Sequence, residues 1–204
     1  MLEGKFEERE KLLEIVRHAT RVLIQHFRTG DIEEVEMEKW VDGRFIGGDI
    51  TGAIDMLVKN RQGKEAVIDL KWSGGKYRRD ELENNNHLQL AVYAVMRKEA
   101  TGKWPEHAYF ILSEARLLAQ DNSFFTDAEI CKAADGEDTN TLWESFEKTW
   151  KWRRDQLDEG LIELTVEGTT ADENSMPPPD AIPIDEHNDK FNDFGALTGW
   201  TEEL

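Results

Sequence analysis

The stretch that decides the fold reads Glu65-Ala66-Val67-Ile68-Asp69-Leu70-Lys71-Trp72. Its composition is typical of a β-strand, in which successive side chains point to opposite faces. One face then carries Ala66, Ile68, Leu70 and Trp72. The other face carries Val67, Asp69 and Lys71, so the acid and the base lie side by side, about 6.6 Å apart along the strand. Such a pair marks either a polar site or a solvated surface.

A second predicted strand, Arg44–Val58, precedes this one and contains Gly52-Ala53-Ile54-Asp55. The polar segment between the strands, Lys59–Lys64, suits a hairpin turn. If the loop is Arg61–Gly63, paired residue numbers sum to 124, and Asp55 lies opposite Asp69. Opposed carboxylates, with Cβ atoms roughly 5 Å apart, destabilise a hairpin. A slip of one residue would move Asp55 to the other face.

A divalent cation between the two carboxylates would reverse that repulsion. Two carboxylates without a nearby cysteine favour Mg²⁺ or Mn²⁺ over zinc. Such an ion lowers the pKa of bound water and neutralises charge on a phosphoryl oxygen. Lys71 adds a compact positive charge that can position the water or stabilise the transition state. The pattern therefore favours metal-dependent cleavage of a phosphodiester bond.

A helix is predicted next, because apolar residues recur at helical spacing; these are Leu88, Ala91, Val92, Val95 and Met96. Asn84, Asn85 and Asn86 are candidate N-caps. Gln89 and Tyr93 are four residues apart and therefore lie on one side of the stripe. They either border the core or belong to a site.

These three motifs resemble those of the PD-(D/E)xK nuclease superfamily, and within it the RecB-like exonuclease branch, over about residues 10 to 165. The resemblance implies an α/β, restriction-endonuclease-like fold: a mixed central sheet flanked by helices, in the order helix, three strands, helix, strand, helix. It implies that Asp55, Asp69 and the Leu70 carbonyl bind the metal. It implies that Lys71 assists catalysis and that Gln89 and Tyr93 orient substrate or ligands.

Two features depart from the family pattern. Many relatives carry a further metal ligand, a His on an N-terminal helix. Here His18 and His26 lie in an amphipathic segment from about Glu7 to Phe27, without a clear motif match. His18 is the candidate ligand; Glu36, Glu38 or a residue preceding Met1 in a longer parent are alternatives. Some relatives also hold an iron–sulfur cluster through four cysteines, which the single Cys131 excludes.

The net charge of −18 is unusual for an enzyme that binds nucleic acid. Residues 155–204 hold 14 acids and one base, a net charge of −13. In contrast, the segment Lys71–Arg79 combines aromatic and basic residues, which suits a single-stranded nucleic acid that threads past the site. Lys76, Arg78 and Arg79 are therefore candidate nucleic-acid contacts, unless the segment is a flexible, solvated surface loop.

The chain is expected to form one domain, residues 1–168, followed by an acidic tail, residues 169–204. The tail is expected to be disordered, with a possible short docking helix. That helix carries Phe191, Phe194, Leu197 and Trp200. It would bind a protein partner or fold back and compete with DNA, unless the tail only aids solubility.

The remaining predicted elements are a strand, Ala108–Ser113, and a helix, Leu142–Leu157, whose aromatic residues Trp143, Phe146 and Trp150 pack in the core. No apolar stretch is long enough for a membrane span, and no signal peptide is evident. The single cysteine fits a reducing compartment. A cytoplasmic location is expected.

The sequence thus predicts a Mg²⁺- or Mn²⁺-dependent deoxyribonuclease. We expect an exonuclease that acts on DNA in repair or recombination, with single-stranded DNA as a candidate substrate. The alternative is a non-catalytic protein of the same fold that binds nucleic acid or a partner protein.

Overall fold

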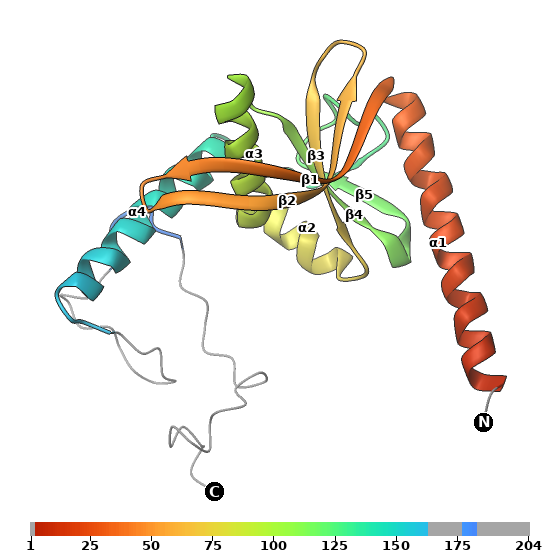
Figure 1. Cartoon of the computed structure of the whole chain (residues 1–204), viewed down its shortest axis with the longest axis horizontal. Helices are drawn as coiled ribbons and strands as arrows, with labels where there is room; N and C mark the ends of the chain where they lie inside the picture. Colours follow the sequence, from red (N-terminus) through yellow and green to blue (C-terminus); the bar gives the residue numbers. More distant parts are fainter. Residues whose placement is uncertain (1–2, 163–176, 183–204) are drawn as a thin grey trace, which may run out of the picture. The chain divides into compact units, whose positions relative to one another are not determined.

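The computed structural model describes residues 3–162 and 177–182, and it divides the chain into two units, residues 1–144 and 145–204. The elements, labelled in Figure 1, are α1 (Glu3–Thr29), β1 (Ile32–Phe45), β2 (Gly48–Asn60), β3 (Glu65–Lys71), α2 (Gly75–Glu83), α3 (Leu88–Thr101), β4 (Glu106–Ile111), the 3-10 helix η1 (Leu112–Glu114), β5 (Arg116–Ala119), β6 (Glu129–Ile130) and α4 (Thr139–Asp158).

The sheet contains its six strands in sequence order, from β1 to β6. Most neighbours are antiparallel, but β3 pairs with β4, and β5 with β6, in parallel. A parallel pair requires a crossover connection, and α2 and α3 supply it between β3 and β4. The predicted α/β fold, a mixed sheet flanked by helices, is confirmed.

The hairpin between β2 and β3 has the predicted register. Met56 pairs with Ile68 and Val58 with Ala66, so the paired numbers sum to 124. The Asn60 side-chain oxygen closes the turn by accepting hydrogen bonds from the Gln62 and Lys64 amides, each at 3.0 Å. The turn therefore lies where the sequence places it, and it sets Asp55 and Asp69 as the first residues beyond the ladder.

Each face of the sheet has its own apolar cluster. On one face, Ala19 and Leu23 of α1 pack with Ala66 and Ile68 of β3. On the other face, Leu82 of α2 and Leu90 of α3 belong to the cluster that contains Val67. The predicted alternation along β3 is therefore confirmed, and Asp69 and Lys71 lie on the face that α2 and α3 cover.

Three predicted boundaries are wrong. The predicted strand Arg44–Val58 joins two strands, because Arg44 and Phe45 end β1 and a turn separates them from Gly48. The segment after β3 is a loop only as far as Gly74, because residues Gly75–Glu83 form the helix α2. The asparagines do not begin α3: Asn84 ends α2, where its side-chain amide donates to the Asp80 carbonyl at 2.8 Å, and His87 is the N-cap of α3.

The second unit contains most of α4 and the described part of the predicted tail. The Ile182 amide donates to Thr149 Oγ1 at 2.8 Å, and Lys148 Nζ lies 3.4 Å from an Asp180 carboxylate oxygen. Residues 177–182 thus contact α4. The proposed domain boundary at residue 168 and the possible docking helix fall outside the described residues. No described helix is both long and apolar enough to cross a membrane.

Candidate active site

Asp69 occupies a buried position near the end of β3, with a side chain only 1% exposed. Its in-register neighbour on β4 is Tyr109, so the two side chains lie next to each other on one face of the sheet. Burial raises the pKa of the Asp69 carboxyl group. Contact with the Lys71 ammonium group opposes this shift, and the charge of Asp55 adds to it.

Lys71 connects two of the sequence motifs. Its Nζ atom lies 2.8 Å from Asp69 Oδ2 and donates a hydrogen bond to Gln89 Oε1 at 2.9 Å. Gln89 comes from the first turn of α3 and is exposed, whereas Asp69 is buried. The three side chains therefore form a polar chain that runs from the interior to the solvent.

Asp55 joins the same constellation from β2. Its Oδ2 atom accepts a hydrogen bond from the Leu70 amide at 2.8 Å, just beyond the last backbone pair of the hairpin. The Asp55 carboxylate therefore links β2 to β3 next to Asp69. The structure thus brings Asp55, Asp69, Leu70, Lys71 and Gln89 together.

Tyr93 is half-buried and packs against the apolar cluster on this face. A Cβ atom on Gly52 would lie 3.2 Å from Tyr93 Cε1. The glycine that precedes Asp55 by three residues therefore leaves room for the tyrosine ring. The Gly-x-x-Asp motif and the Gln-x-x-x-Tyr motif therefore pack directly against each other.

The carboxylates suit a hard divalent cation. Apart from the ion pair with Lys71, both oxygens of Asp69 are buried without a hydrogen-bond partner in the described part of the chain. Burial removes the interactions of such a carboxylate with water, and a bound cation that prefers oxygen ligands would replace them. However, within residues 3–162 and 177–182, no three His, Cys, Asp or Glu side chains form a metal-binding group.

The candidate third ligands do not join Asp55 and Asp69 in such a group. His18 is exposed on α1, and its neighbour Ala19 packs on the face of the sheet opposite Asp69. Glu36 is paired with Lys39 at 2.6 Å, and Glu38 is exposed. The role of His18 as a ligand stays a prediction without geometric support.

The three predicted nucleic-acid contacts lie on α2 in different environments. Lys76 is exposed. Arg78 pairs with Glu81 at 2.6 Å, and its guanidinium carbon lies 5.2 Å from the ring centre of Tyr109, the neighbour of Asp69. The positive charge of Arg78 also lowers the pKa of Asp69, although less than burial raises it. Of the three residues, Arg78 is therefore the one whose charge acts on Asp69.

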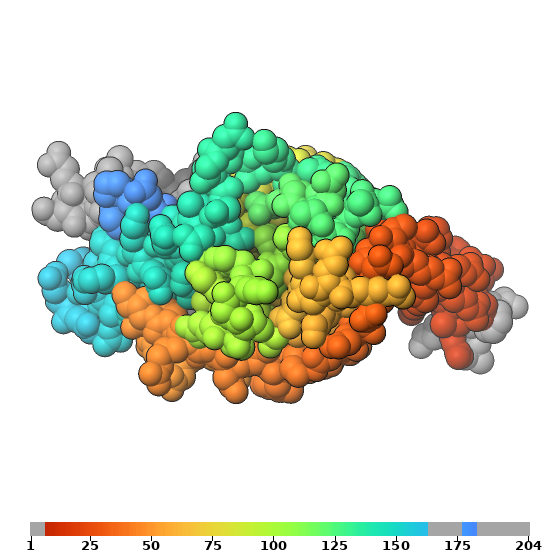
Figure 2. Space-filling view, turned by 90° about the horizontal axis from the view of Figure 1, so that it is seen from above, coloured from red at the N-terminus to blue at the C-terminus, as the bar shows by residue number. Residues whose placement is uncertain are grey.

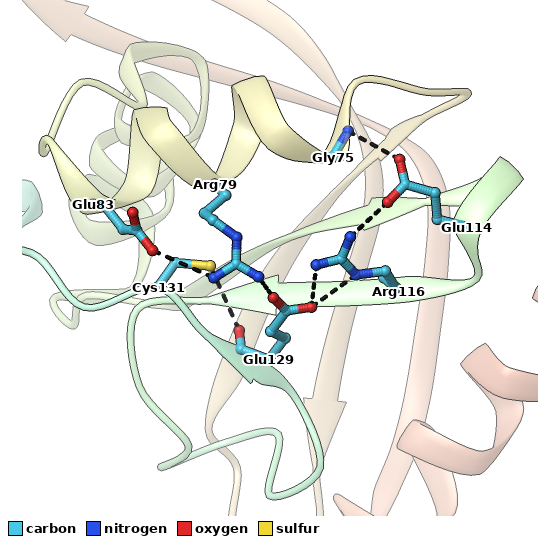
Figure 3. Close-up of polar contacts among 7 residues, drawn as sticks. All are labelled: Gly75, Arg79, Glu83, Glu114, Arg116, Glu129 and Cys131. Atoms are coloured by element: carbon cyan, nitrogen blue, oxygen red, sulfur yellow. Dashed lines mark hydrogen bonds and ion pairs between the residues drawn. The ribbon is translucent and has the colours of Figure 1, made fainter.

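Arg79 belongs to an ion-pair network that holds α2 in place. Figure 3 shows Glu129 between the guanidinium groups of Arg79 and Arg116, and both pairs are ionic. At the start of the helix, Glu114 accepts hydrogen bonds from the Gly75 amide (3.2 Å) and from Arg116 (2.7 Å). The network ties α2 to η1, β5 and β6, which fixes the position of Arg78.

Sequence reasoning missed Tyr109 and Glu81 as neighbours of the site. Burial raises the pKa of Tyr109 well above its usual value, with a smaller contribution from Glu81. The only sequence signal for Tyr109 is a phenol within an otherwise apolar strand. Glu81 gave no signal, because it reaches the site only through the orientation of α2.

The sequence of the chain also matches a known protein family. The family model described as "PD-(D/E)XK nuclease superfamily" matches residues 4–172. The chain belongs to the PD-(D/E)XK nuclease superfamily. Members of this superfamily are generally nucleases and typically use divalent metals. No curated protein sequence matches the chain significantly.

Proposed function

We propose that this PD-(D/E)XK protein is a Mg²⁺- or Mn²⁺-dependent deoxyribonuclease of the RecB-like branch that acts as an exonuclease. The single observation that carries the proposal is the position of Lys71 Nζ between Asp69 and Gln89. Three of the residues that the superfamily resemblance marks as catalytic, two from β3 and one from α3, are thereby in contact.

Asp55, Asp69 and the Leu70 carbonyl would hold the cation. When bound, the cation supplies charge neutralisation at a phosphoryl oxygen and lowers the pKa of bound water. Lys71 adds a fixed positive charge next to Asp69, and Gln89 fixes its orientation by accepting its hydrogen bond. Tyr93, supported by its packing against Gly52, orients substrate or ligands from the same side of α3.

The surface beside the site suits a nucleic-acid strand. Trp72 and Tyr77 are exposed large aromatic residues, with 46% and 61% of their surface accessible. Arg78 lies over the Tyr77 ring, 4.9 Å from its centre, and Lys76 is exposed on the same helix. Aromatic platforms next to cations support binding of unpaired bases and their phosphates. We infer that single-stranded DNA contacts Lys76 and Arg78, and that Arg79 contacts it at the edge of this surface.

A nuclease assay tests this function. The full chain is incubated with Mg²⁺ or Mn²⁺ and with end-labelled linear DNA, circular single-stranded DNA and RNA of the same sequence. We expect metal-dependent loss of the linear DNA only, and none with Asp69→Asn. Cleavage of circular DNA would contradict the exonuclease assignment, preference for RNA would contradict the substrate, and activity in folded Asp69→Asn would contradict the site.

A second candidate is a non-catalytic member of the superfamily that binds nucleic acid or a partner protein. It is favoured by the finding that only two carboxylates meet here, without a third metal-binding side chain among the residues that the structure describes. Under this alternative, DNA binds the chain but neither Mg²⁺ nor Mn²⁺ changes its melting temperature. A protein partner for the acidic tail and a cytoplasmic location remain predictions from the sequence.

A further inference from the structure

An open cavity of about 430 Å³ lies away from the candidate active site. The β2–β3 turn, the end of α3 and the start of β4 form its walls, and in Figure 2 the amber turn lies beside the lime-green end of α3. Its charged and aromatic lining residues are Lys59, Lys64, Glu65, Lys103, Trp104 and Glu106. Gln89, at the other end of α3, is twelve residues from Thr101 in the cavity wall.

The charge of the cavity is positive, although the chain as a whole carries −18. Three lysines line the cavity; Lys59 is paired with Glu34 at 3.8 Å, which leaves Lys64 and Lys103 as the lysines available to a ligand. Glu65 is neutralised by Arg97, which contacts it through Nε at 3.1 Å and Nη2 at 2.8 Å. Burial and the charge of Asp121 raise the pKa of Glu106, whereas the charge of Lys64 lowers it. The balance therefore favours an anionic ligand.

Trp104 gives the cavity an aromatic surface. Its indole is half-buried, and Lys98 Nζ lies 4.1 Å from the ring centre, which adds a further cation. Lysines beside an aromatic ring combine the two interactions that bind a nucleotide, namely charge with phosphate and contact with the base. Inorganic anions use only the first of these.

We propose that this cavity binds a nucleotide unit of the DNA strand whose other part lies in the active site. The lysines contact its phosphate and Trp104 contacts its base. This inference rests on the proposed nuclease function. Twelve helical residues separate the two sites by about 18 Å. At the spacing of stacked bases in duplex DNA, about 3.4 Å, that distance corresponds to about five nucleotides, and an extended single strand spans it with fewer. The cavity thus favours substrates that are long enough to reach both sites.

Binding without turnover tests the proposal. Fluorescently labelled oligothymidylates of three and twelve nucleotides are titrated with the full chain in EDTA, so that a lack of nuclease activity does not affect the result. Lys64→Gln/Lys103→Gln should weaken binding of the 12-mer and leave the 3-mer unchanged. The slope of log K against log salt should fall by about 1.4 for two lost contacts. Lys11→Gln/Lys132→Gln, at exposed positions elsewhere, is the control with equal charge.

Two further measurements make the assignment specific. A 12-mer with 5-iodouracil at successive positions should crosslink to the peptide that contains Trp104 only when the label lies within a narrow window, at most about five nucleotides from the end in the active site. Trp104→Leu should abolish that crosslink. Equal effects of the two double substitutions, or crosslinks confined to other peptides, would overturn the proposal. Thymidine monophosphate binding as tightly as the 12-mer would overturn it too, because a free nucleotide would then be the ligand.

Discussion

Lys71 donates a hydrogen bond to Gln89 across 2.9 Å, which joins the end of β3 to the first turn of α3. The two residues are eighteen positions apart. Because Lys71 also contacts Asp69 at 2.8 Å, its ammonium group cannot rotate away without breaking two interactions. The arrangement pre-organises a positive charge beside the carboxylate, and such pre-organisation is a large contribution to catalysis.

The first prediction concerns Lys71. Lys71→Met should reduce kcat by about 10²- to 10³-fold, the usual effect of removing one group that stabilises transition-state charge. Metal binding should remain, because the ligands that we propose are Asp55, Asp69 and the Leu70 carbonyl. Kinetics and calorimetry with Mn²⁺ measure the two effects separately. Loss of metal binding in a folded variant would show that the division of roles is wrong.

Gln89 provides a test of positioning. Gln89→Ala removes the acceptor of the Lys71 hydrogen bond from an exposed side chain, so the fold should remain stable. We expect kcat to fall by up to about 10²-fold, as for other small misplacements of catalytic groups. Gln89→Glu keeps an acceptor and should recover much of the activity. If Gln89→Glu and Gln89→Ala were equally impaired, a role through Lys71 would be wrong.

Asp55 connects metal binding to stability. Saturating Mn²⁺, at about 100 times its Kd, should stabilise the folded protein by about 2.7 kcal/mol. For this chain length the melting temperature should rise by roughly 5–10 °C. Asp55→Asn keeps an oxygen that can accept from the Leu70 amide but removes a charge beside Asp69. Without metal, the melting temperature of the variant should be at least as high as that of the wild type. Mn²⁺ should raise the melting temperature of the variant much less than that of the wild type.

Calorimetry of both proteins with and without Mn²⁺ checks this prediction. Na⁺ at equal ionic strength separates specific binding of Mn²⁺ from screening. A wild-type melting temperature that does not respond to Mn²⁺ would favour the non-catalytic alternative. An Asp55→Asn variant that keeps the full shift would remove Asp55 from the set of ligands.

The sequence predicts β3 and its hairpin well because the pattern there is local. Alternation places Asp69 and Lys71 on one face, and the polar turn fixes the register. In contrast, α2 buries only Gly75 and Leu82, so it has no apolar stripe to reveal it. The network of Arg79, Glu114, Arg116 and Glu129 joins residues up to 50 positions apart, and such pairing depends on the tertiary fold.

Arg78 and Arg79 should therefore respond differently to substitution. Arg78→Met removes a guanidinium beside Tyr109 and Asp69, so it should weaken DNA binding and reduce the salt slope by about 0.7 to 0.9. Arg79→Met breaks a partly exposed ion-pair network, so it should lower stability by about 1 kcal/mol or less. Its effect on binding should be smaller. Fluorescence anisotropy at several salt concentrations and urea unfolding measure both variants; equal loss of binding would contradict the distinction.

The stacked pair His87 and His107, with ring centres 4.7 Å apart, predicts acid sensitivity. Burial is the main cause that lowers the pKa of His87 to about 2 and that of His107 to about 4. In the unfolded chain both pKa values are about 6.5. Above that pH both states are neutral and the pair does not affect the pH dependence. As the pH falls below about 6.5, only the unfolded state binds protons, so the free energy of unfolding decreases.

The decrease should approach about 1.4 kcal/mol per pH unit for each histidine between about pH 6 and 4. The raised pKa values of Asp69 and Glu106 act in the opposite direction, so variants are needed to isolate the histidines. His107→Phe keeps an aromatic ring against His87 and should flatten the slope, whereas His18→Gln, at an exposed position, should not. Urea unfolding at pH 7.5, 6.0, 5.0 and 4.5 gives these slopes. Equal slopes for wild type and His107→Phe would mean that the buried pair is not the source of the acid sensitivity.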